Sequence, residues 1–186
     1  MFGWLSARST SLCRRAPRAV VSRRIRQITP HALINMLPGL GSVLYLHANS
    51  NTAVPDALPQ GLLIAQRSFT PLLDAHWLVA VSVVTDDGPR EWCECVDRTG
   101  HTRARWHLLP DTDYLAWDAL TAPCTGMPAP IDTQPLRPDH ASVVNFRLRE
   151  FAGMQILDQD LVAPLSPLGD RIAARIARAE SALLQS

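Results

Sequence analysis

The chain of 186 residues contains no lysine, and all 18 of its basic residues are arginine. It also has no excess of one charge, since the formal net charge is only +1. No segment approaches the roughly 20 consecutive apolar residues that a membrane-spanning helix needs. We therefore expect no membrane span. With 47% hydrophobic residues, the chain can bury the core of one folded domain.

Acidic residues are absent from the first 30 positions, which carry seven arginines. The rest of the chain has eleven arginines against seventeen carboxylates, a net charge of −6. An acidic body argues against broad nucleic-acid binding, which depends on neutralising phosphates. We interpret residues 1–28 as a disordered basic N-terminal extension. An arm that contacts a membrane or RNA is the alternative.

Motifs that carry common chemistries are also missing. The sequence has no Gly-rich phosphate loop, no HExxH and no GxSxG, and no spacing typical of paired catalytic carboxylates or of a nucleophile with its base. Cys93 and Cys95 are separated by one residue, so they would share one face of a strand and are not spaced as zinc ligands. Nothing requires an oxidising compartment. We expect a cytoplasmic protein, more a carrier than an enzyme.

Residues 29–122 are predicted to form an α+β domain, in which helices flank an antiparallel β-sheet. Thr29 and Pro30 are typical of the N-cap and first position of a helix, and Asp111 or Thr112 is placed to cap a second one. Apolar and β-branched runs indicate strands, and a turn from Asp97 to Gly100 indicates a hairpin. The predicted helices are 31–37 and 111–122, and the predicted strands are 41–47, 62–65, 76–84, 91–96 and 101–109.

The predicted strand 101–109 has two distinct sets of side chains. Because neighbouring residues of a strand point to opposite faces, one face would be largely apolar and the other cationic. The apolar set is Thr102, Ala104, Trp106 and Leu108, and the cationic set is His101, Arg103, Arg105 and His107. We expect the apolar face to be buried and the cationic face to be exposed.

The last third of the chain is predicted to be a proline-rich linker followed by helices. Five prolines fall within residues 123–138, which is typical of an extended crossing segment. Residues 139–153 are expected to be helical. Ser166 and Pro167 begin a second helix, whose apolar stripe is Leu168, Ile172, Ile176, Ala179 and Leu183. The helical segment 139–186 would pack on the domain or on a second subunit.

Several of these segments together resemble the HemS/ChuX-like haem-utilisation (hemin transport/degradation) family of Gram-negative bacteria. The resemblance covers residues 30–122 and is best over the last thirty. The similar segments are 37–43 (LPGLGSV), 51–54 (NTAV), 76–81 (HWLVAV), 95–100 (CVDRTG) and 114–120 (YLAWDAL). The chain departs from the family pattern at 46–49, at Pro55-Asp56, and at Cys95-Val96, where the family has two phenylalanines.

The resemblance implies a single-repeat, b-type haem-binding protein, which accepts haem and passes it on. His140, within Pro138-Asp139-His140, is similar to the family's iron-ligating histidine. Arg103 and Arg105 would face the two haem propionates, because guanidinium groups bind carboxylates with paired hydrogen bonds. Trp77, Trp106 and His76 would line the site. The implied partners are haem, a second copy of the chain, and haem-import or haem-degrading proteins.

Other interpretations stay open. His140 is more typical of an ordinary surface histidine near a helix start, and Arg103 and Arg105 are more typical of a solvated face of the sheet. The same fold without haem would be a structural or regulatory interaction protein. A haem-degrading enzyme is a further alternative, because the chemistry of a cofactor depends on the geometry of its pocket.

Overall fold

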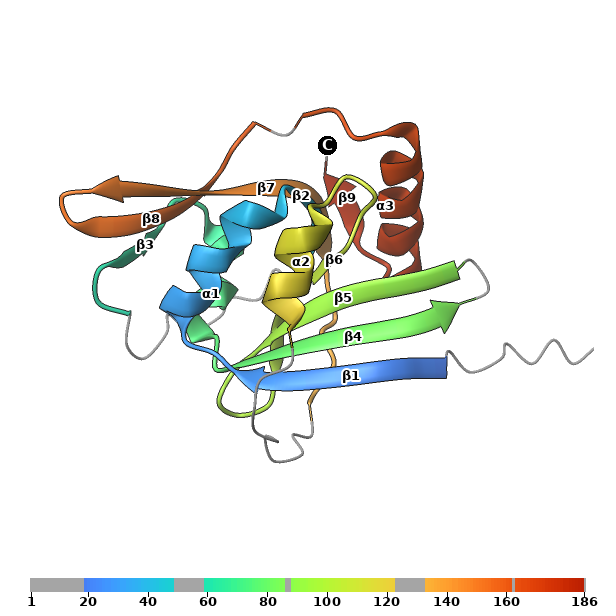
Figure 1. Ribbon diagram of the computed structural model, residues 1–186, viewed down its shortest axis with the longest axis horizontal. Helices are drawn as coiled ribbons and strands as arrows, with labels where there is room; N and C mark the ends of the chain where they lie inside the picture. The colour runs from blue at the N-terminus through green and yellow to red at the C-terminus, as the bar shows by residue number, and fades with distance from the viewer. Residues whose placement is uncertain (1–18, 49–58, 86–87, 123–132, 162, 186) are drawn as a thin grey trace, which may run out of the picture.

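The computed structural model of the protein describes residues 19–48, 59–85, 88–122, 133–161 and 163–185 (Figure 1). It confirms a mixed α+β architecture built on one large, mostly antiparallel sheet. Strands run side by side in the order β1-β4-β5-β6-β2-β7-β8-β3, and β9 pairs with β7. The strands are β1 (Ala19–Gln27), β2 (Ser42–His47), β3 (Leu62–Ile64), β4 (Trp77–Thr85), β5 (Gly88–Val96), β6 (Thr102–His107), β7 (His140–Phe151), β8 (Met154–Gln159) and β9 (Leu183–Gln185).

Three hydrophobic cores pack on the two faces of this sheet; the third and smallest, Val79, Val81, Val83 and Val96, lies opposite the first. The first core joins one face to α1 (Pro30–Met36), α2 (Tyr114–Thr121) and the 3₁₀ helices η1 (Leu37–Leu40) and η2 (Arg67–Asp74). Trp106 and Trp117 are among its largest fully buried side chains. The second core joins the other face to α3 (Pro167–Ala179). Figure 1 shows α1 and α2 in front of the sheet and α3 at its right-hand end.

Capping explains where the helices begin. The Thr29 side chain accepts a hydrogen bond from the Ala32 amide, so the predicted start of α1 is confirmed. The predicted cap of α2 was wrong, because Asp113 takes that role. Thr112 instead accepts from the Leu109 amide and donates to the Ser42 carbonyl, while Asp111 accepts from the Ser166 amide.

The predicted disordered extension is wrong for residues 19–27, which form β1. This strand pairs antiparallel with β4 along its length, from Ala19 opposite Val84 to Gln27 opposite Trp77. It lies at an edge of the sheet, where it pairs with backbone N–H and C=O groups of β4 that would otherwise be unpaired. The sequence did not predict this strand because its arginines interrupt the apolar pattern. An edge strand tolerates them, since it can carry charged side chains on both faces. Residues 1–18 lie outside the described residues.

The predicted helix at 139–153 is also wrong, since these residues form β7 and its turn. Apolar side chains recur every second residue at Val144, Phe146 and Leu148, which is the period of a strand. The hairpin closes through Ala152 and Gly153, whose φ angles are 50° and 75°. A two-residue turn between twisted antiparallel strands requires both of its residues to have positive φ angles.

The C-terminal helix begins at Ser166 and Pro167 as predicted, and it packs on the domain itself. The buried side is rotated from the predicted stripe: Ala173, Ile176 and Ala177 are buried, whereas Leu168 is 51% exposed. Beyond the helix, Leu183 begins β9 and pairs in parallel with β7. Strands from before residue 28 and from after residue 139 therefore belong to the same sheet as the predicted domain, so the boundaries expected at residues 28, 122 and 139 do not separate structural units.

The described end of the predicted linker belongs to the domain as well. Gln134 exchanges backbone hydrogen bonds with Gly100 and Thr102, and Leu136 enters the second core. Residues 123–132 lie outside the described residues, as do the Asp86-Asp87 turn and the 51–56 segment of the family resemblance.

Candidate functional site

Two histidines meet where the last residue of β2 pairs with the first residue of β7. His47 is directly opposite His140 in the strand register. Their rings stack with centroids 5.5 Å apart and an angle of 29° between planes. Both residues are partly exposed. Because His47 also contacts the ring of Tyr45 two residues earlier, the pair lies on the face that carries the first core.

Each ring uses its Nδ1 atom toward a protein group. His47 Nδ1 lies 3.4 Å from the Ala48 carbonyl oxygen, and His140 Nδ1 lies 3.1 Å from the side-chain amide of Gln185. The atom of Gln185 that faces Nδ1 is its side-chain nitrogen, so Nδ1 of a neutral His140 accepts this hydrogen bond and its proton is on Nε2. Only a half-turn of the amide, which brings its oxygen to Nδ1, would leave the lone pair on Nε2, whereas Nε2 of His47 keeps its lone pair opposite the Ala48 carbonyl. Metal-binding histidines are commonly held in this way, by a second hydrogen bond that selects the tautomer and orients the ring.

Burial lowers the pKa of His47 below its ordinary value of 6.5, and the positive charge of a protonated His140 lowers it further. The Ala48 carbonyl and the Asp139 carboxylate act in the opposite direction but do not cancel this effect. A neutral imidazole is the form that coordinates a metal ion. The ring of His47 is thus kept in the coordinating form at neutral pH.

Arg105 does not lie on an exposed cationic face, contrary to the prediction. It is 8% exposed and forms ion pairs with Glu94 at 3.0 Å and Glu180 at 3.1 Å. Its guanidinium also lies 5.5 Å from the centroid of the Trp92 ring. The prediction failed because α3 and the residue that follows it, Glu180, cover this part of the sheet. Two carboxylates already occupy the guanidinium that was expected to bind propionates.

The other residues of strand β6 differ from the prediction in the same way. Arg103 pairs with Asp74 at 3.4 Å and Asp97 at 3.8 Å. Asp74 ends η2, which belongs to the first core, whereas Glu180 follows α3 of the second core. The two arginines therefore pair toward opposite faces of the sheet, because a register shift between β5 and β6 interrupts the alternation of side chains at Arg103. His107 is buried, at 3% exposure, and only His101 is exposed as predicted.

His76 and Trp77 are far from His140. Trp77 is the first residue of β4 and His76 precedes it, and their rings meet edge to face with centroids 5.0 Å apart. Four strand-to-strand steps separate β4 from β7, which is about 19 Å at roughly 4.8 Å per step. Trp106 is fully buried in the first core. His76, Trp77 and Trp106 thus lie apart from His140, and Arg103 and Arg105 are paired with carboxylates; the residues that contact His140 are His47 and Gln185.

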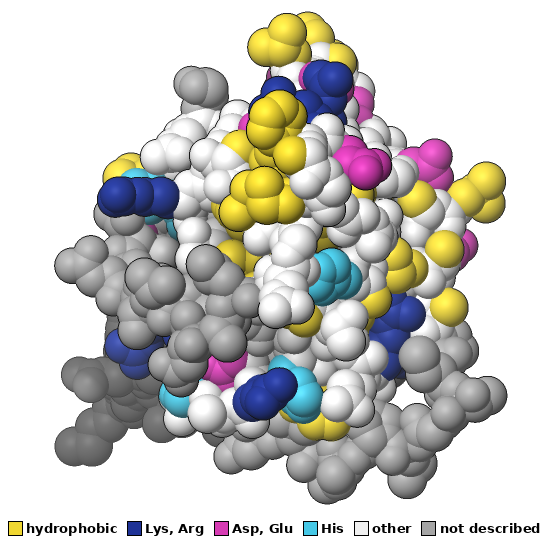
Figure 2. All heavy atoms as spheres, turned by 90° about the vertical axis from the view of Figure 1, so that its left-hand side faces the viewer, with side chains coloured by type: hydrophobic (Ala, Val, Ile, Leu, Met, Phe, Trp, Pro, Cys, Tyr) yellow, Lys and Arg dark blue, Asp and Glu magenta, His cyan; other side chains and the backbone are white. Residues whose placement is uncertain are grey.

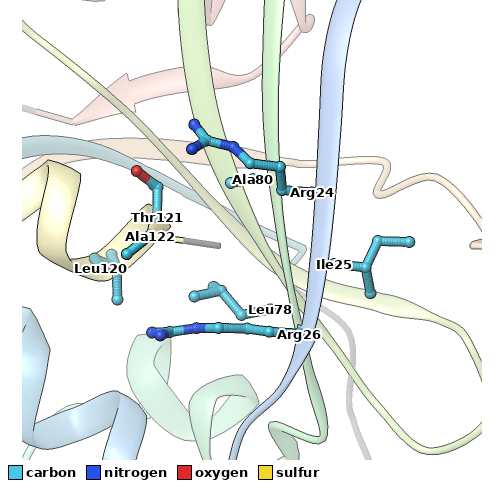
Figure 3. Close-up of a pocket in the computed structure, with 8 residues that line it drawn as sticks. All are labelled: Arg24, Ile25, Arg26, Leu78, Ala80, Leu120, Thr121 and Ala122. Carbon is cyan, nitrogen blue, oxygen red and sulfur yellow. The ribbon is translucent and has the colours of Figure 1, made fainter. Parts of the chain in front are cut away.

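A separate hollow lies between β1 and the end of α2 (Figure 3). Arg24 and Arg26 line one side, with Leu78, Leu120 and Thr121 around them. The enclosed space is only about 20 Å³, and the rest of the hollow is open to solvent. Sites for drug-sized ligands typically enclose about 300–1,000 Å³, so this hollow is far too small for haem.

Within the described ranges, no three histidine, cysteine or acidic side chains are grouped so that they could hold a metal ion. The helices described there are also too short or too polar to cross a bilayer. No protein-family model matches the chain, and no curated protein resembles it significantly.

Proposed function

We propose that this protein binds haem through His140, with His47 as a supporting imidazole, and passes the haem on unchanged. The observation that supports the proposal is the stacked histidine pair, in which both Nδ1 atoms face protein groups. The proposal keeps the iron ligand that the family resemblance implies and replaces the rest of the predicted site.

The donor set of the pair fits haem iron. Iron in haem is commonly bound by one neutral imidazole, and the protein tunes the bond through hydrogen bonds to that ring. Gln185 makes such a contact with His140, and stacking on His47 fixes the ring plane. A partly exposed imidazole at the end of two strands suits exchange, because an incoming protein can reach the ligand.

Arg103, Arg105, Trp77 and His76 are not part of the proposed site. The arginines are engaged with carboxylates, and the other two residues lie four strands away. Freeing Arg105 would leave Glu94 and Glu180 without their counter-charge, which is costly for groups that are largely buried. The haem propionates are therefore expected to face solvent.

An absorbance titration with haemin tests the proposal. The expected result is a shifted Soret band that saturates at one haem per chain at micromolar concentration. Adding apomyoglobin should then withdraw the haem with its spectrum intact, as a carrier requires. Loss of the Soret band on addition of a reductant and oxygen would indicate degradation instead. A spectrum identical to that of free haemin would rule out binding.

A second candidate is a haem-free interaction protein, and the β7–β8–β3 end of the sheet favours it. Leu63 and Ile156 are paired there, as are Phe151 and Met154, on one face. Phe151 is 68% exposed and Leu63 is 40% exposed. Figure 2, which faces this end of the molecule, shows hydrophobic side chains gathered beside charged ones of both signs.

The partner that fits this face is a second copy of the chain. The ion pairs Arg147–Asp160 and Arg149–Asp158 flank the apolar residues and supply both charges. A two-fold contact places each sign opposite the other. Sedimentation of a Phe151→Ser variant tests this candidate, with Leu115→Ser as control because Leu115 is 82% exposed on α2. The wild type and Leu115→Ser should dimerise and Phe151→Ser should not; a monomeric wild type would exclude the contact.

A further inference from the structure

The hollow beside β1 concentrates positive charge. Arg24 and Arg26 are two residues apart on β1, so their side chains leave the same face of the strand. Figure 3 shows both extending toward the end of α2, on either side of the space above Leu78. They reach the hollow from β1, an edge strand of the sheet, and part of the hollow is open to solvent.

These two guanidinium groups lack acidic partners in the part of the chain that the structure describes. The ion pairs found there involve neither Arg24 nor Arg26. Among the described residues, the Arg26 side chain donates to the Met36 sulfur at 3.3 Å, and its Nε atom is buried without a hydrogen-bond partner. A buried donor without an acceptor costs about 1–3 kcal/mol. An acceptor in the hollow would remove that cost.

The neighbouring polar groups do not supply this acceptor. The Glu91 carboxylate accepts hydrogen bonds from Trp117 at 3.0 Å and from Ser82 at 3.5 Å. The Thr121 hydroxyl donates to the Trp117 carbonyl. The positive charges of Arg24 and Arg26 therefore have no counter-charge among the residues that line the hollow.

We propose that this hollow binds a phosphate group through Arg24 and Arg26. Guanidinium groups bind oxyanions with two parallel hydrogen bonds, and two of them match a doubly charged, four-oxygen group better than a carboxylate. The apolar floor of Leu78, Ala80 and Leu120 lowers the local dielectric, which strengthens the attraction. The ligand is inorganic phosphate or the phosphate end of a small phosphomonoester, since the enclosed space is only about 20 Å³ and the rest of the hollow is open to solvent.

This site is separate from the histidine pair. Arg26 and His140 lie on the same row of the sheet, five strands apart, or about 24 Å at roughly 4.8 Å per step. A single haem could not use both sites. Phosphate binding therefore neither requires nor supports the haem proposal.

Phosphorus NMR tests the site directly. The full chain is titrated into inorganic phosphate, glycerol 3-phosphate and, as a carboxylate probe, acetate followed by proton NMR, all at constant ionic strength. Saturable broadening is expected with both phosphates and not with acetate. Tighter binding of the ester would identify a phosphomonoester as the ligand, and equal binding would identify free phosphate.

The double variant Arg24→Gln/Arg26→Gln should weaken phosphate binding at least tenfold. Arg23→Gln is the matched control, because Arg23 lies on the same strand but faces the other side of the sheet and contacts Thr133. His140→Ala should leave phosphate binding unchanged. The proposal is overturned if the wild type shows no saturable binding, or if Arg23→Gln weakens it as much as the double variant. Single Arg24→Gln, at an exposed position, is expected to fold and to lose binding in part.

Discussion

Arg105 offers a prediction whose size follows from its surroundings. The side chains of Arg105 and Glu94 are each 9% exposed, and that of Glu180 is 20% exposed. Replacing Arg105 with Met keeps the apolar part of the side chain but leaves two carboxylates without their counter-charge. Breaking a buried ion pair from one side costs about 3–5 kcal/mol. Single domains are stable by about 5–15 kcal/mol, so a large share of the stability would be lost.

Urea unfolding followed by circular dichroism measures this loss. Arg147→Met is the matched control, because the Arg147–Asp160 pair is 53% and 51% exposed. An exposed pair contributes about 0–1 kcal/mol. A double variant, Arg105→Met with Glu180→Gln, should cost less than the sum of its single variants, since the second change removes one stranded charge.

The outcome that would refute this account is equal destabilisation by Arg105→Met and Arg147→Met. Equal costs would mean that Arg105 is solvated and that α3 does not enclose it. The argument that Arg105 is unavailable to haem would then fail as well.

Three further predictions follow from individual contacts. Because the pKa of His47 is lowered in the folded state, the unfolded chain takes up the proton first, and stability should fall as pH drops below about 6.5; His47→Gln should reduce this fall in urea unfolding curves measured between pH 5 and 8. Desolvation alone would raise the pKa of Asp97, but hydrogen bonds from Thr99 and His101 lower it below 3.8. Its contribution should thus be present above that pH and lost as pH falls further, and Asp97→Asn should cost about 1–3 kcal/mol at pH 7 by the same assay. A Cβ at position 169 would lie 2.0 Å from an Asp111 carboxylate oxygen. Gly169→Ala should therefore lower the melting temperature, although alanine is favoured over glycine in helices by about 1 kcal/mol. A higher melting temperature would show that the Asp111 side chain moves away without cost.

Local signals predicted much of the fold. The starts of α1 and α3 follow from Thr29-Pro30 and Ser166-Pro167, since capping depends on neighbouring residues alone. The β5–β6 hairpin follows from alternation around the Asp97–Gly100 turn. Residues 19–27 and 140–151 were assigned wrongly because arginine content and a proline-rich approach outweighed a strand signal that becomes clear only beside a partner strand.

The site was much harder to predict, for a physical reason. Whether Arg105 is exposed depends on α3, which arrives more than sixty residues later in the chain. The meeting of His47 with His140 depends on the register between β2 and β7. His47 looked like an ordinary histidine at a strand end, and no local pattern reveals its partner. The same long-range register excludes His76 and Trp77.

The measurement that tests the central claim most directly is haemin affinity in a His140→Ala variant compared with His76→Ala. Both remove a partly exposed histidine at the start of a strand, but only His140 belongs to the pair. Haemin affinity should fall at least tenfold in His140→Ala, or by about 1.4 kcal/mol, and stay unchanged in His76→Ala. Equal affinity in both variants, or a larger loss in His76→Ala, would contradict the assignment of His140 as the iron ligand.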